Sequence, residues 1–186
     1  MCGDIWLAIE DLVQSQETVQ GAAARRILAA GEEGILALRE AALGDRRDVA
    51  MESARILSEL DYPQHFEIMC ELLHAPNPLI SLAGVKGLER HGEKAIEPLT
   101  KALSNGHALI QGSVLGVLER LGTHLVVAAL MNLLAAADVP MLRYSVIATL
   151  GRLGDPVAIP LIQSFKDDLD YHVREHVAIA LERLGT

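Results

Sequence analysis

Two stretches of the sequence repeat each other 31 residues apart: Leu142–Gly154 reads LRYSVIATLGRLG, and Val173–Gly185 reads VREHVAIALERLG. Each begins with an aliphatic residue and an arginine and ends in Arg-Leu-Gly. The closing glycine has counterparts every 30 to 32 residues, with one aspartate in the series: Gly31, Asp61, Gly92, Gly122, Gly154 and Gly185. We call these six positions the anchors. They indicate one unit of about 31 residues that occurs six times.

Apolar or small residues recur at fixed distances before the anchors. The residues twelve before are Val19, Val49, Ile80, Ile110, Leu142 and Val173, and those four before are Ile27, Leu57, Leu88, Leu118, Leu150 and Leu181. The residues eight before are smaller, and a further column, mostly apolar, stands one before. This spacing forms one stripe of a helix with 3.6 residues per turn. It predicts a helix of about 13 residues before each anchor, ended by a glycine in the left-handed conformation.

A second apolar run follows each of the first five anchors and also indicates a helix. The unit is therefore a helix–turn–helix pair, which cannot bury its own apolar stripe and must stack on its neighbours. No linker or change of composition interrupts the series, so we expect one domain over residues 1–186. Its expected repeats are approximately 1–31, 32–61, 62–92, 93–122, 123–154 and 155–185.

The repeated pattern resembles the HEAT-like repeat that is named after phycobilisome lyases. The resemblance rests on Val-Arg, Ala, Ala-Leu and Leu-Gly within residues 173–185, on the matching residues of 142–154, and on Ala95-Ile96-Glu97-Pro98-Leu99 and Ala158-Ile159-Pro160-Leu161. It covers essentially the whole chain. It implies an all-α fold, a right-handed α-solenoid of about six HEAT-like helix–turn–helix repeats of the armadillo/HEAT type. It says little about function, because one fold carries many functions.

The composition excludes several classes of function. Hydrophobic residues make up 51% of the chain, aromatic residues only 3%, and the net charge is −9. Such an acidic chain is a poor binder of nucleic acid. The longest apolar run, Leu125–Ala137, is too short to cross a bilayer, and the N-terminus lacks the basic start of a signal peptide. The two cysteines, Cys2 and Cys70, form no disulfide or zinc pattern. We expect a cytoplasmic protein without a cofactor or a membrane partner.

In a solenoid of this kind the second helices line the concave side, and their outward positions lie ten, six and three residues before each anchor. We therefore expect a non-catalytic protein-binding scaffold or adaptor that holds a peptide or helix of a protein partner. The partner-binding residues are expected to be Arg25, Met51, Arg55, Leu82, Lys86, Gly112, Gly116, Tyr144, Ala148, Gly151, Glu175 and Ile179. The position six before the anchor is basic in the first three repeats, while the middle of this face is small or apolar and its end is acidic.

Two hypotheses explain the glycines at positions 112 and 116. Gly112 and Gly116 each cost a helix about 1 kcal/mol relative to alanine. Either they leave a shallow trough for a partner backbone, with Tyr144 as an anchor beside it, or they admit a tightly packed neighbouring helix.

No catalytic motif is present, and we expect no catalytic residues. His172 and His176 are four residues apart on one helix and could in principle bind a metal, but no third ligand is apparent. The HEAT-like hydroxylases use His-Glu dipeptides as iron ligands, and no histidine of this chain precedes a glutamate. We therefore expect these histidines to be ordinary surface residues and the chain to bind no metal.

Two alternatives stay open. The resemblance by itself allows a subunit of a bilin or chromophore lyase, or another phycobilisome-related protein. In addition, no polar capping repeat is visible after the last repeat, residues 155–185. An uncapped end would allow the chain to self-associate through this repeat.

Overall fold

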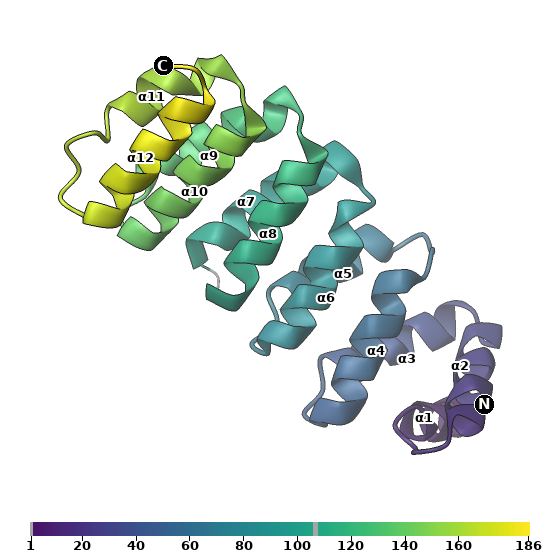
Figure 1. Ribbon diagram of the computed structural model, residues 1–186. Coiled ribbons are helices and arrows are strands. Elements are labelled where there is room, and N and C mark those ends of the chain that lie inside the picture. The colour runs from purple at the N-terminus through teal and green to yellow at the C-terminus, as the bar shows by residue number, and fades with distance from the viewer. Residues whose placement is uncertain (1, 106–107) are drawn as a thin grey trace. The chain divides into compact units, whose positions relative to one another are not determined.

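The computed structural model describes residues 2–105 and 108–186, and the expected first and fourth repeats therefore each include residues outside this description. In the described part all regular elements are helices. Figure 1 shows them following one another as antiparallel pairs, coloured from purple to yellow along the chain. Among the described residues, no helix combines the length and the apolar character that crossing a bilayer requires.

The chain divides into two compact units, Met1–Arg90 and His91–Thr186. Unit 1 contains three helix pairs: α1 (Cys2–Asp11) with α2 (Glu17–Ala29), α3 (Glu32–Ala42) with α4 (Arg47–Glu59), and α5 (His65–Leu73) with α6 (Pro78–Glu89). Unit 2 contains α7 (Ile96–Asn105) with α8 (Ala108–Leu121), α9 (His124–Ala136) with α10 (Pro140–Leu153), and α11 (Ile159–Gln163) with α12 (Tyr171–Arg183). The short 3₁₀ helices η1 (Gly92–Ala95) and η2 (Pro156–Ala158) precede α7 and α11. The helix–turn–helix repeat predicted from the sequence is confirmed.

The anchors end the second helix of each pair as expected. In the described part of the chain, five residues have a positive φ, between 57° and 80°, and all five are the anchor glycines 31, 92, 122, 154 and 185. Glycine adopts this left-handed conformation without steric cost. The sixth anchor, Asp61, ends its helix differently, because Leu60 before it is extended, with ψ at 157°.

The columns before the anchors form the core. Every residue four or eight before an anchor is buried, and so are five of the six residues twelve before, Val19 being half-buried. The residues one before the anchors are half-buried throughout. One face of each second helix is therefore removed from water, and this burial of apolar surface is the main force that holds each unit together.

Helix starts follow the local sequence. The side chain of Asn77 accepts a hydrogen bond from the N–H of Leu79 at 3.0 Å, with Pro78 at the first helical position of α6. Asp155 accepts from the N–H of Val157 in the same way at the start of η2, again before a proline. These caps satisfy donors that the first turn leaves without a partner in the helix.

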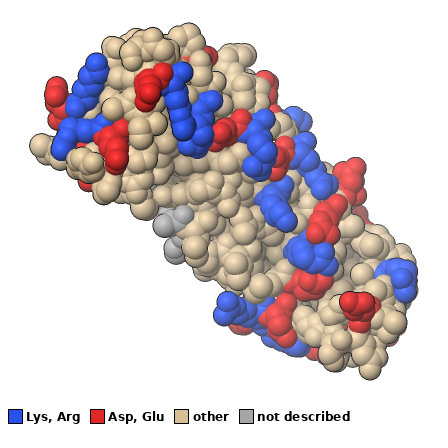
Figure 2. Space-filling model, in the orientation of Figure 1, with Lys and Arg blue, Asp and Glu red and all other residues tan. Residues whose placement is uncertain are grey.

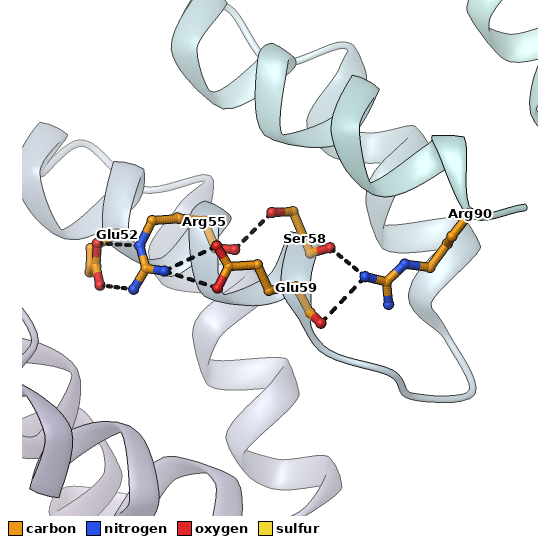
Figure 3. Close-up of polar contacts among 5 residues, drawn as sticks. All are labelled: Glu52, Arg55, Ser58, Glu59 and Arg90. Carbon is orange, nitrogen blue, oxygen red and sulfur yellow. Dashed lines mark hydrogen bonds and ion pairs between the residues drawn. The ribbon is translucent and has the colours of Figure 1, made fainter. Parts of the chain in front are cut away.

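An arginine from the next repeat caps the end of α4. Arg90 donates from its guanidinium to the carbonyl oxygens of Leu60, Ser58 and Glu59 at 2.7, 3.1 and 3.3 Å. Figure 3 shows the bonds to Ser58 and Glu59. The last carbonyls of a helix have no partner within the helix and carry its negative dipole end, so a cation stabilises them. The arginine two before the anchor thus stabilises the preceding repeat as well as its own helix end.

Replacing Arg90 by alanine is expected to lower the free energy of unfolding of unit 1 by about 1.5 kcal/mol, because three carbonyl groups lose a charged donor. Trp6 lies in α1 and is the chain's one tryptophan, so its fluorescence in a urea titration follows unit 1. A matched control is Arg183→Ala, since Arg183 holds the same repeat position and no hydrogen bond or ion pair is seen for it in the described residues. Because Arg183 lies in unit 2, denaturation followed by circular dichroism measures the effect of this change. Equal effects of the two changes would contradict the capping role.

Candidate functional site

Four of the expected partner-binding residues line one groove of unit 1. Met51 and Arg55 come from α4, and Leu82 and Lys86 from α6, at the positions ten and six before their anchors. The groove has a volume of about 470 Å³. Its other lining residues come from the turn after α1 and from α2, α4 and α6: Leu12, Val13, Gln20, Asp48, Glu52, Ser58, Leu79 and Ala83. Arg25 is exposed on α2 and lies outside this lining.

The wall of the groove is apolar. Met51 and Leu79 are exposed, and Leu82 between them is half-buried, so three large apolar side chains of α4 and α6 face open space. Leu12 and Ala83 close the floor and are buried. A concave apolar wall with charged residues at its margin is the arrangement that ligand and peptide sites in proteins share.

Arg55 does not give the groove the positive charge that the sequence suggested. Its guanidinium donates to Glu52 from Nε and Nη2, at 3.0 and 2.5 Å, and to Glu59 from Nη1 at 3.0 and 3.1 Å (Figure 3). These two carboxylates raise the pKa of Arg55, the hydrogen bonds to Glu52 most strongly, although partial burial opposes the rise. Arg55 is thus held along α4 by its own helix, and its charge is more than balanced.

The remaining charges around the groove are mixed. Lys86 is exposed, while Asp48 lies 3.9 Å from Arg46. Figure 2 shows acidic and basic side chains interspersed on the visible face rather than gathered by sign. We expected the residues six before the first three anchors to make the groove basic. This expectation is wrong for Arg55, because the glutamates at i−3 and i+4 neutralise it.

In unit 2 the glycines of α8 face open space. A Cβ added to Gly112 would meet no atom within 4 Å, and one added to Gly116 would approach only Arg120 Nη1, at 3.5 Å. Neither glycine admits a closely packed helix, so the second of the two hypotheses is wrong for this structure. The other hypothesis, a trough that receives a partner backbone beside Tyr144, stays a prediction.

Gly112→Ala is therefore expected to raise the free energy of unfolding of unit 2 by about 1 kcal/mol, since alanine is the better helix former and nothing obstructs its methyl group. Thermal or urea denaturation followed by circular dichroism measures the change. A loss of stability would show that a neighbour occupies the space beside Gly112.

The other expected residues of unit 2 lie on α10 and α12. Tyr144 is half-buried, Glu175 is exposed, and Ala148 and Ile179 line a small hollow of about 160 Å³ with His176, Arg152, Ala180 and Arg183. Gly151 is the exception and requires a correction. It is buried, and a Cβ there would lie 2.8 Å from the Cα and Cβ of Ala180, so Gly151 allows α10 and α12 to pack closely and lines no surface.

The residues thirteen before each anchor are not among the expected partner-binding residues. These are Thr18, Asp48, Leu79, Leu109, Met141 and His172, and all six are exposed. Asp48 and Leu79 line the groove of unit 1. The signal was available, because adding one more helical turn to the stripe at ten, six and three before the anchor reaches the position thirteen before.

The exposed face of α12 is largely charged. Arg174, Glu175, Glu182 and Arg183 are all exposed, with Tyr171 and Ile179 as the exposed apolar residues. This composition resembles a polar cap more than an open apolar end.

Of the two cysteines, Cys70 is a free thiol, whereas the side chain of Cys2 lies outside the described part.

The described residues contain no group of three or more His, Cys, Asp or Glu side chains arranged to hold a metal ion. His172 and His176 do lie together on α12, where the Nδ1 atom of His176 is 2.8 Å from the carbonyl oxygen of His172.

The family model described as HEAT repeats matches residues 96–182. The match covers somewhat less than half of the chain. The matched segment begins at α7 and ends in the last turn of α12. The helix pairs of unit 1 share the anchors and buried columns of the HEAT repeats, so the whole described chain has the all-helical fold of an α-solenoid of the armadillo/HEAT type. The narrower resemblance to phycobilisome-lyase repeats stays a prediction. Among the curated proteins, none matches this chain.

Solved structures with similar helix arrangements have low sequence identity to this chain. An engineered protein is 17% identical, covers 98% of this chain and 96% of its own, and has a TM-score of 0.46. Human deoxyhypusine hydroxylase in complex with glycerol is 16% identical, with 99% and 96% covered and a TM-score of 0.47. A designed armadillo repeat protein in complex with the peptide (KR)4 is 14% identical, with 96% and 98% covered and a TM-score of 0.44.

Proposed function

We propose that this chain is a non-catalytic protein-binding scaffold or adaptor, which holds a segment of a partner protein in the groove of unit 1. The observation that carries the proposal is the groove itself, about 470 Å³ in volume, whose wall of Met51, Leu79 and Leu82 is left open. Its lining lies mostly on α4 and α6, which the buried columns hold in place. Little conformational entropy is then lost on the protein side when a partner binds.

The chemistry of the groove indicates the kind of segment that fits. Apolar side chains of a peptide or an amphipathic helix would contact Met51, Leu79 and Leu82, and the charged margin of Asp48 and Lys86 would favour one orientation. Because Arg55 is already paired with Glu52 and Glu59, a purely acidic partner has little to gain here. We therefore propose that apolar anchor residues, more than charge, select the partner.

The hydroxyl group of Ser58, which lines the groove, is not placed to act as a catalytic nucleophile. Ser58 is buried and its Oγ donates to the carbonyl oxygen of Arg55 at 2.7 Å, so it is occupied within its own helix. We place the protein in the cytoplasm, which is supported by the free thiol of Cys70, since a reducing compartment keeps such thiols unpaired.

Selection from a displayed library of random peptides tests the proposal and needs no identified partner. The wild-type protein is expected to enrich peptides with two or more apolar anchors. Met51→Glu should weaken their binding at least about tenfold, because a charge would replace an apolar contact in the wall. Leu36→Glu is the matched control, since Leu36 is 51% exposed on α3 and lies outside the groove.

Circular dichroism of both variants would verify that they are folded. If no peptide is enriched, or if the two variants bind the enriched peptides equally well, the groove is not a peptide-binding site and the proposal fails.

A further inference from the structure

His172 and His176 form a pair on the surface of α12. The two residues are one turn apart, so both side chains leave the helix on the same side. The His172 side chain is 63% exposed and His176 is half-buried. Two imidazole groups at this spacing on a helix can bind one metal ion together.

The hydrogen bond of the His176 ring leaves its Nε2 atom available to a metal ion. Nδ1 of His176 lies 2.8 Å from the carbonyl oxygen of His172, and a carbonyl can only accept, so Nδ1 carries the proton and Nε2 carries the lone pair. Nδ1 of His172 faces the carboxylate of Glu175 at 3.8 Å. Imidazoles that bind metals commonly donate their other N–H to a backbone carbonyl or to a carboxylate, which orients the ring.

An aromatic ring from the neighbouring helix supports the pair. Tyr144 of α10 stacks on His176 with 5.0 Å between ring centroids and 28° between planes, and its centroid is 6.0 Å from that of His172. A ring that is held in this way loses less rotational freedom when it binds a ligand. The His176 ring is therefore restrained by α10 as well as by its own helix before any metal binds.

We propose that His172 and His176 together form a binding site for a divalent transition-metal ion of the zinc type, with water in the remaining coordination positions. Imidazole nitrogen is a preferred ligand of zinc, copper and nickel. Because no cluster of three or more ligand side chains exists in the described residues, the protein supplies two ligands and the ion stays accessible from solvent. The site is independent of the groove in unit 1.

The chain contains a matched control in His74. His74 directly follows the last residue of α5, and its Nδ1 lies 2.8 Å from the carbonyl oxygen of Cys70, four residues earlier, so it has the same tautomer as His176. The residue one turn away is a thiol rather than an imidazole. Burial, with a smaller effect of Glu67, raises the pKa of Cys70, which keeps the thiol protonated and a poor metal ligand.

A titration of the ¹⁵N-labelled protein with Zn²⁺, read from the imidazole nitrogen resonances, tests the site. The Nε2 resonances of His172 and His176 are expected to shift together, with one shared midpoint. His74 and the exposed His124 should need at least about tenfold more zinc. Removing His176 by His176→Ala should raise the midpoint of His172 at least about tenfold, whereas His124→Ala should leave it unchanged.

The wild-type titration decides the proposal even if a variant were poorly folded. If His172 and His176 respond at different zinc concentrations, or only where His74 and His124 also respond, the two imidazoles do not act as one site. An unchanged midpoint of His172 in a folded His176→Ala variant would overturn the proposal equally.

Discussion

Gly84→Ala is expected to lower the free energy of unfolding of unit 1 by about 3 kcal/mol. A Cβ at Gly84 would lie 2.5 Å from the backbone nitrogen of Leu73 and 2.7 Å from the carbonyl oxygen of Met69. Both atoms belong to the backbone of α5, so no side chain can move aside, and α5 and α6 would have to separate. Urea denaturation followed by Trp6 fluorescence measures the loss.

Gly87→Ala is the matched control in the same helix. A Cβ at Gly87 would meet side chains rather than backbone, mainly that of Met69, which is fully buried but has more rotamers available than a backbone has positions. We therefore expect a smaller loss, about 1 kcal/mol. If Gly84→Ala were as stable as the wild type, or if Gly87→Ala were the more damaging change, the close approach of the α5 and α6 backbones would be wrong.

Arg143→Ala is expected to lower the free energy of unfolding of unit 2 by about 3 kcal/mol. Arg143 of α10 donates to Asp168 Oδ2 at 3.0 Å and to the carbonyl oxygen of Ala137 at 2.9 Å. The Asp168 side chain is only 7% exposed, and its other oxygen accepts from the N–H of Asp170. Without Arg143 a buried carboxylate would lose its cation, which costs much more than the loss of a surface ion pair.

A double-mutant cycle separates this pair from the other contacts. The combined Arg143→Ala and Asp168→Ala variant is expected to lose about 2 kcal/mol less than the sum of the two single changes. Arg174→Ala is the control, since Arg174 holds the same repeat position but bonds only to the backbone carbonyls of Asp168 and Leu169. Additive losses in a circular dichroism denaturation experiment would show that Arg143 and Asp168 are not coupled.

The repeat and its core could be predicted from the sequence because both depend on periodic burial. Leu57 and Leu88 stand four before their anchors, and both are fully buried. The left-handed glycines were predictable for the same reason, since each follows the last apolar residue of a helix.

The roles of the helical glycines could not be predicted. Gly84, Gly112 and Gly151 stand in three second helices but have three different environments. A methyl group added to Gly84 would clash with the backbone of α5, one added to Gly151 would clash with Ala180, and one added to Gly112 would meet no atom within 4 Å. These differences depend on how closely the neighbouring helix approaches, which no pattern within one helix encodes. Gly151 was therefore misassigned to the outward face.

The prediction of a basic groove failed because of residues close to Arg55 in the sequence. Glu52, Arg55 and Glu59 are spaced i, i+3 and i+7, so both acids lie within about one turn of the arginine on the same side of α4. The basic column at six before the anchors does not show these neighbours, because they belong to the same helix as Arg55. The cap formed by Arg90 is different, because it joins residues about 30 positions apart and depends on the stacking of repeats.

Hydrogen exchange of the wild-type protein, with and without a peptide enriched by the library selection, is the most direct test of binding in the groove. Slower amide exchange on peptide binding is expected in Arg47–Glu59 and Pro78–Glu89, the two helices that supply Met51 and Leu82. Protection confined to α5, which contributes no residue to the groove, or confined to unit 2, would contradict the assignment of the partner site.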